Sequence, residues 1–132
     1  MRLVSDDAWA VMTIWQEARG EAMEGKVAIG EVIRNRVNHS YNCNGTVSGC
    51  VLAPLQFSGW NARDTNRIPS SVLDSDDSIV AECIKAWRLS ANSTLTHGAV
   101  LYYSPGVGQS PPDWAVQSNF IVQLGRHKFY RG

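Results

Sequence analysis

Hydrophobic residues recur three and four positions apart in three stretches of the chain, the spacing that places them on one face of a helix. The first stretch follows Ser5, a residue type that caps helices, and predicts a helix that runs to about Ala18. The second predicts a helix over about 23–37, and the third predicts a helix over about 76–90 that is capped by Ser75. Each predicted helix therefore has one apolar face that is expected to be buried.

The pattern changes twice outside these helices. Between 38 and 71 it dissolves into Asn, Gly, Ser and Pro, a connection too long for a small domain unless it has a function. Near the C-terminus, apolar and aromatic runs predict a strand over 99–103 and a hairpin of 120–124 and 127–130, whose two-residue turn starts with Gly125. We expect a mainly α (α+β) fold, with residues 1–132 forming a single domain and a small antiparallel β element near its C-terminus.

Composition narrows the possible functions. The 132 residues include 12 basic and 12 acidic side chains, so the chain lacks the positive field that nucleic-acid binding usually needs. No apolar run approaches the roughly 20 residues that cross a bilayer. We therefore expect neither nucleic acid nor membrane insertion. Asp6 and Asp7 fall where a signal peptide has its apolar segment, so no export signal is expected in the chain as given.

The three cysteines exclude two further classes. They form no CxxC pair and have no paired histidine at ligand spacing, so a zinc site is not expected. An odd number also rules out a full disulfide framework. Cys43 and Cys50 flank a polar loop that a disulfide can close in an oxidising compartment, whereas Cys83 lies on the apolar face of the third helix and is expected in the core.

Glu17 is the first candidate for chemistry. It lies at the end of the first helix, after apolar and aromatic residues. The negative end of the helix dipole and partial burial beside Trp15 both favour a protonated carboxyl group, and Arg19 or Lys26 would oppose this effect by pairing with it. A protonated carboxyl near neutral pH is what a general acid requires. A solvated glutamate at a helix end fits the same pattern, so the residue types alone leave both interpretations open.

Glu21 and Glu31 are the natural second carboxylates. Two carboxylates about 5 to 10 Å apart support ordinary glycoside hydrolysis, whereas with a single carboxylate the sugar's own hydroxyl can act as nucleophile. Glu31 lies in the middle of the second helix, where pairing with Arg34 or with a backbone group is the simpler expectation.

Polar and aromatic side chains elsewhere form a plausible sugar-binding set, although packing in the core or hairpin explains them as well. Because strand residues alternate, Tyr102 and Tyr103 are expected on opposite faces, one in the core and one available. No serine has the setting of a hydrolase nucleophile, and no glycine-rich loop has the context of a phosphate site. The set comprises Gln56, Ser58, Trp60, Tyr102, Tyr103 and Trp114.

Three blocks of sequence, in order along nearly the whole chain, resemble SleB-type cell-wall hydrolases, the family that contains the spore-cortex-lytic enzymes. The first block is Ile-Trp-Gln-Glu-Ala-Arg-Gly-Glu at 14–21, continued by a Glu-Gly pair and a helix that ends in Asn-Arg-Val at 35–37. The second runs from Val51 to Ser58 and contains Pro54 and Gln-Phe-Ser at 56–58. The third contains Gly-Ala-Val-Leu-Tyr-Tyr-Ser-Pro at 98–105, then Trp114 and the Gly-Arg-His-Lys-Phe-Tyr run that ends the chain's hairpin.

The resemblance implies a lysozyme-like, largely helical domain that cleaves peptidoglycan between N-acetylmuramic acid and N-acetylglucosamine. It assigns the catalytic acid to Glu17 and favours a lytic transglycosylase, in which Glu17 acts as acid and then as base without metal or organic cofactor. A hydrolytic muramidase with a second carboxylate and a non-catalytic peptidoglycan-binding module are the alternatives. The resemblance does not decide the role of Glu21, which either assists the chemistry or holds Arg19 or a helix end. The substrate-binding residues expected are Glu21, Gln56, Phe57, Ser58, Tyr102, Tyr103 and Trp114.

The expected partner is therefore the glycan strand of peptidoglycan, bound by a monomer. Size and the lack of an export signal favour a phage-type endolysin that waits in the cytoplasm until it is released to the cell wall. A trimmed domain of an exported enzyme has the same sequence features.

Overall fold

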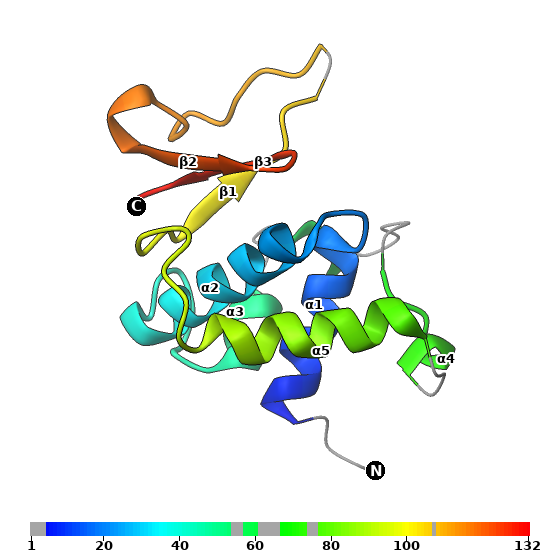
Figure 1. Cartoon of the computed structure of the whole chain (residues 1–132). Helices are drawn as coiled ribbons and strands as arrows, with labels where there is room; N and C mark the ends of the chain where they lie inside the picture. The colour runs from blue at the N-terminus through cyan, green and yellow to red at the C-terminus, as the bar shows by residue number, and fades with distance from the viewer. Residues whose placement is uncertain (1–4, 54–56, 61–66, 74–76, 107) are drawn as a thin grey trace.

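A group of helices carries a small sheet on one side in the computed structural model of the protein (Figure 1). The structure describes residues 5–53, 57–60, 67–73, 77–106 and 108–132. The longer helices are α1 (Asp6–Ala18), α2 (Met23–His39) and α5 (Ser78–Ser90). The shorter elements between and after them are α3 (Val47–Val51), η1 (Ser58–Trp60), α4 (Ser70–Leu73) and η2 (Gln117–Asn119).

Helix α1 is the central element of the helical part. It begins after Ser5, whose hydroxyl accepts a hydrogen bond from the Ala8 N–H at 3.3 Å, and ends at Ala18 as predicted. Ala10 and Ile14 are fully buried, and the helix packs against α2, α3, α5 and η1. Its C-terminal end points toward the sheet (Figure 1), so a side chain in its last turn can meet residues from the strands.

The other two predicted helices are confirmed, with shifted ends. Helix α2 extends to His39, and Ser40 ends it in the left-handed conformation, with φ at 48°. The prediction that Ser75 caps the third helix is wrong, because the cap is Asp77. The Asp77 carboxylate accepts hydrogen bonds from the N–H groups of Ile79 at 2.7 Å and Val80 at 3.2 Å, which satisfies two donors of the first turn.

The sheet has three antiparallel strands in the order β1-β3-β2: β1 (Leu101–Tyr103), β2 (Phe120–Leu124) and β3 (His127–Tyr130). The predicted hairpin of β2 and β3 is confirmed, and Gly125 opens its turn with φ at +58°. The first strand is two residues shorter than predicted. Tyr102 pairs with Phe129 in the register, and both side chains pack on the helical core.

A second, smaller cluster lies on the other face of the sheet. Leu101 and Tyr130 are buried there, and Tyr103, Trp114 and Phe120 pack against them. The alternation of a strand explains this division, because Tyr103 must face away from its neighbour Tyr102. The sheet therefore has an inner face toward the helices and an outer aromatic face.

The cysteines follow the pattern of the sequence. Cys43 and Cys50 form a disulfide, which joins the segment after α2 to α3. Cys83 is free and fully buried in the core, as expected. In the part of the chain that the structure describes, no helix is long and apolar enough to cross a membrane.

Candidate active site

Three segments far apart in sequence meet at Glu17. Its side chain leaves the last turn of α1 and is half-buried. One carboxylate oxygen accepts a hydrogen bond from the Tyr102 hydroxyl on β1 at 2.5 Å, and the other accepts one from the Gly59 N–H of η1 at 3.2 Å. Both oxygens of the carboxylate are thus oriented by donors that the fold holds in place.

Helix α1 itself holds η1 beside Glu17. The Trp60 indole donates a hydrogen bond to the Thr13 hydroxyl at 2.8 Å, and the Trp60 ring packs edge-on against Trp9. Gly59 is required for this approach, because a Cβ there would lie 2.8 Å from the Gln16 side chain. The absence of a side chain lets the Gly59 N–H reach Glu17.

The Tyr102 hydroxyl is a persistent donor. Burial raises the pKa of the Tyr102 phenol well above its ordinary value, and the negative charge of Glu17 raises it further. The Tyr102 ring packs against Phe57, His127 and Phe129. Phe57 was expected in the substrate groove, but its side chain is 1% exposed and belongs to the core beneath Tyr102.

An open pocket of about 310 Å³ runs past Glu17 to Glu21. Polar groups dominate its walls, which come from the end of α1, the residues after it, the end of β1 and the turn between β2 and β3. Two carboxylates therefore face one polar pocket. Its lining residues are Gln16, Glu17, Ala18, Arg19, Gly20, Glu21, Ser104, Arg126 and His127.

Glu21 is occupied in holding the hairpin turn. Its Oε1 accepts a hydrogen bond from the Arg126 N–H at 3.1 Å and lies 3.6 Å from the Arg126 Nε. A Cβ on Gly125 would collide with the same carboxylate, so the turn fits tightly over it. Lys26, considered above as a partner of Glu17, donates instead to the Glu21 backbone carbonyl and pairs with Glu82 at 3.5 Å. The structure thus gives Glu21 a role in fixing the turn beside Glu17.

His127 links the folding stability of the protein to pH. Its Nδ1 lies 3.4 Å from Glu21 Oε1, and burial lowers the pKa of His127, partly offset by the charge of Glu21. Since the folded pKa lies below the unfolded value of about 6.5, the unfolded chain takes up the proton first as the pH falls. The stability due to neutral His127 is thus complete above about pH 6.5 and is lost as the pH falls through the lower, folded pKa.

We expect the melting temperature of the wild-type protein to fall more steeply between about pH 7 and pH 5 than that of His127→Gln, because the variant lacks this titration. Thermal unfolding followed by circular dichroism at several pH values measures both slopes. The exposed His97 is the control, since His97→Gln should keep the wild-type slope. Equal slopes for His127→Gln and the wild type would contradict the expectation.

Glu31 is excluded from the pocket. It is 3% exposed and accepts hydrogen bonds from the N–H groups of Leu95 and Thr96, each at 2.9 Å. The hydroxyls of Thr96, at 2.7 Å, and of Ser93 donate to it as well. The sequence suggested Arg34 or a backbone group as the partner of Glu31. Backbone groups are found, and they come from the segment after α5.

The remaining sugar-binding candidates are not all at the pocket. Tyr103 packs on Trp114 and Tyr130, each with ring centroids 5.9 Å apart, on the outer face of the sheet. Ser58 begins η1 next to the Gly59 donor, whereas Gln56 lies outside the described residues.

The structure brings Glu17, Glu21 and Tyr102 together and places Tyr103 and Trp114 on the other face of the sheet. Sequence reasoning missed the parts that Gly59 and His127 play at the pocket. The sequence offered one signal for Gly59, its position between Ser58 and Trp60, two candidates for sugar binding.

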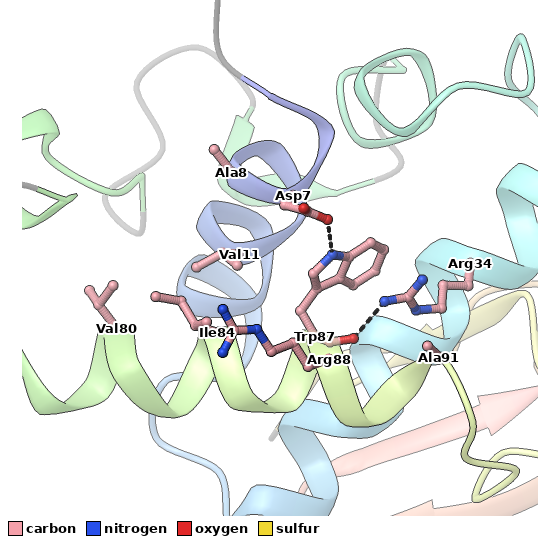
Figure 2. A pocket seen from close by; sticks show the side chains of 9 residues that line it. All are labelled: Asp7, Ala8, Val11, Arg34, Val80, Ile84, Trp87, Arg88 and Ala91. Carbon is pink, nitrogen blue, oxygen red and sulfur yellow. Dashed lines mark hydrogen bonds between the residues drawn. The ribbon is translucent and has the colours of Figure 1, made fainter.

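A larger hollow of about 510 Å³ lies between α1 and α5 and differs in character (Figure 2). Its surface is mainly apolar. The Trp87 indole donates to Asp7 at 2.7 Å, and Arg34 donates to the Trp87 carbonyl at 2.6 Å. Among the described residues that line it, Asp7 is the one carboxylate, so these residues offer no acid pair. Within the described ranges, no group of three or more His, Cys, Asp or Glu side chains is arranged to hold a metal ion.

Comparison with known proteins gives independent findings on the family. The cell wall hydrolase family matches residues 20–130, a range that starts three residues after Glu17. The chain is 33% identical over 116 residues to the spore cortex-lytic enzyme of Oceanobacillus iheyensis and 32% identical to that of Bacillus subtilis. Each match covers 88% of this chain, but only 38% and 34% of the length of these two relatives.

Solved structures share the fold. The catalytic domain of the Bacillus cereus SleB protein superposes with a TM-score of 0.67 at 24% identity, covering 96% of this chain and 89% of that one. The catalytic domain of the germination-specific lytic transglycosylase SleB from Bacillus anthracis gives 0.65 at 25% identity, covering 96% and 93%. These matches confirm the predicted mainly helical fold with a small C-terminal sheet.

Proposed function

The chain belongs to the cell wall hydrolase family, and on that premise we propose that it cleaves the glycan strands of peptidoglycan with Glu17 as the general acid. One observation carries the proposal. The Glu17 carboxylate faces a polar pocket while Tyr102 and Gly59 orient both of its oxygens. A general acid needs this fixed position beside space for the substrate.

In the proposed reaction, Glu17 gives its proton to the glycosidic oxygen between N-acetylmuramic acid and N-acetylglucosamine. The bond to the muramic acid C1 breaks, and positive charge develops on that sugar ring. The Tyr102 hydroxyl and the Gly59 N–H stabilise the carboxylate that forms on Glu17. This carboxylate then removes the proton from the C6 hydroxyl of the muramic acid. The hydroxyl oxygen bonds to C1 at the same time, which closes an anhydro ring without consuming water.

The engagement of Glu21 supports transglycosylation over hydrolysis. Hydrolysis with two carboxylates needs the second one to act as nucleophile or to activate water. Glu21 instead contacts Arg126 and His127 of the hairpin and has 9% of its side chain exposed. Glu17 as the single acid and base fits this arrangement, and the Bacillus anthracis protein of the same fold is described as a lytic transglycosylase.

The test is a digest of purified peptidoglycan, followed by mass spectrometry of the soluble fragments without chemical reduction. Fragments that end in anhydro-muramic acid are lighter by one water than reducing-end products, and they are the expected result. Reducing-end sugars would show hydrolysis instead. If folded protein releases no fragments, the result would contradict the enzyme and favour the non-catalytic peptidoglycan-binding module.

Glu21→Gln is expected to lower the cleavage rate by about tenfold or less, because the amide keeps the shape but loosens the hairpin turn beside Glu17. The rate of fragment release from peptidoglycan measures this loss. Glu24→Gln is a matched control, since Glu24 is exposed at the start of α2. A loss as large as that of Glu17→Gln would instead make Glu21 a second catalytic carboxylate and favour the hydrolytic mechanism.

The finer biological role stays a prediction. The phage-type endolysin, its waiting place in the cytoplasm and the monomeric state are expectations from the sequence, and the geometry of the pocket is independent of all three.

A further inference from the structure

Arg36 is a buried cation that forms no ion pair with a carboxylate of the described residues. It lies on α2 with 3% of its surface exposed, and its Nε donates a hydrogen bond to the Val100 carbonyl at 2.6 Å. Its Nη1 is also buried and has no hydrogen-bond partner in the part of the chain that the structure describes. Burying a charge is costly unless it is paired, so this arrangement calls for an explanation.

Its surroundings place Arg36 beneath the Glu17–Tyr102 pair. The guanidinium carbon lies 4.6 Å from the centre of the Phe57 ring, and that ring packs against Tyr102 with centroids 6.1 Å apart. Its backbone partner, Val100, precedes Tyr102 by two residues. Tyr102 in turn donates to Glu17 at 2.5 Å. A chain of contacts through Phe57 and Tyr102 therefore links the cation to the carboxylate that faces the pocket.

The electrostatics of Arg36 point to the same residue. Burial lowers the pKa of Arg36, and electrostatic interactions with three neighbouring groups oppose that effect, Tyr102 most and Glu17 least. Two of the three are tyrosines, which are neutral at ordinary pH. Glu17 is the one carboxylate among them, and the other two groups are Tyr102 and Tyr41. Arginine keeps its charge even when its pKa is lowered, so a permanent positive charge lies within electrostatic reach of Glu17.

We propose that Arg36 is a positioning residue for the reaction, whose buried positive charge stabilises the Glu17 carboxylate that forms when the acid gives up its proton. The inference rests on the proposed function of Glu17 and deepens it. Arg36 does not touch the substrate. Because it lies in the low-dielectric interior and no closer carboxylate neutralises it among the described residues, its field at Glu17 is stronger than that of a surface cation.

Other charged groups also face Glu17, and the test must separate them from Arg36. Arg19, Glu21, Arg126 and His127 line the pocket with it, and Tyr102 faces it from β1. The Arg126 side chain is 76% exposed, so dissolved salt screens its charge. A buried guanidinium is screened much less, and this difference gives a second measurement.

The first measurement is a carbon-13 NMR titration of the Glu17 carboxyl group, assigned by comparison with Glu17→Gln. Arg36→Met is expected to raise the pKa of Glu17 by about one unit, because the carboxylate loses a buried cation. Arg36→Lys keeps the charge and should reverse most of this shift.

Arg34→Met is the matched control for this titration. Arg34 lies on the same helix but stacks on Trp87 at 3.6 Å beside the hollow of Figure 2, so it should leave Glu17 unchanged. An unchanged pKa of Glu17 in folded Arg36→Met would overturn the proposal.

The second measurement needs no variant of Arg36 and applies if Arg36→Met does not fold. The wild-type Glu17 titration is repeated at about 0.05 M and about 0.5 M NaCl, where the Debye length shortens several-fold. A pKa that moves by less than about 0.2 units is expected for a buried partner. A clear rise with salt would assign the effect to surface cations and overturn the proposal.

Failure of the proposed function is distinguishable from failure of this inference. If peptidoglycan is not cleaved at all, the proposed function fails, while the titration still reports whether Arg36 acts on Glu17. If cleavage is lost in Glu17→Gln but the Glu17 pKa is unaffected by Arg36→Met, the function stands and the role of Arg36 is refuted.

Discussion

Glu17→Gln is expected to lower the rate of peptidoglycan cleavage by about a thousandfold, within the range that a positioned general acid contributes. The amide keeps the size of the side chain but has no proton of suitable acidity to give to the glycosidic oxygen. Its oxygen can still accept from the Gly59 N–H while its NH2 group donates to the Tyr102 hydroxyl oxygen, so both contacts can be kept with the second one reversed.

Release of soluble fragments from purified peptidoglycan measures the rate, and thermal unfolding checks that the variant is folded. Glu24→Gln is the matched control, because it makes the same chemical change at an exposed position of α2 and should keep the wild-type rate. Binding to insoluble peptidoglycan should persist in Glu17→Gln. A variant that cleaves at the wild-type rate would remove Glu17 from the mechanism.

The helices were predictable because their signals are local. The apolar spacing and Ser5 located α1, and the glycine at 125 located the hairpin turn, since each signal depends on neighbours within a few residues. The start of α5 was misplaced because both Ser75 and Asp77 are cap residues, and sequence does not show which side chain reaches the free N–H groups.

The arrangement around Glu17 was less predictable, because it joins distant parts of the chain. Tyr102 is 85 residues from Glu17 in sequence and Gly59 is 42 residues away. Residue types and the family resemblance both selected Glu17 and Tyr102, but both also grouped Tyr103 and Trp114 with them. The register of β1 separates these residues, because alternate side chains of a strand face opposite sides.

The last turn of α1 explains why this position suits an acid. Three hydrogen-bonded connections fix its neighbourhood: Trp60 to Thr13 on one side, Tyr102 to Glu17 itself, and the hairpin turn to Glu21. None of these depends on the substrate. The pocket is therefore already formed in the free protein, so little reorganisation is needed when a glycan strand enters.

Glu31→Gln is expected to reduce the free energy of unfolding by about 3 kcal/mol, because a buried charged acceptor with four donors loses part of its hydrogen bonding. An amide oxygen accepts from fewer of these donors, and the NH2 group must face an N–H or a hydroxyl. A loss of this size lowers the melting temperature by about 10 °C in a domain of this length. Thermal and urea unfolding measure both quantities.

Glu24→Gln is the control, since Glu24 is exposed at the start of α2. A melting temperature for Glu31→Gln equal to that of the wild type would refute the expectation. Well below its melting temperature, Glu31→Gln should keep most of its cleavage rate, because Glu31 does not line the pocket. Glu17→Gln should show the reverse pattern, with stability kept and cleavage lost. The two variants together separate the carboxylate that holds the segment leading to β1 from the one that performs the chemistry.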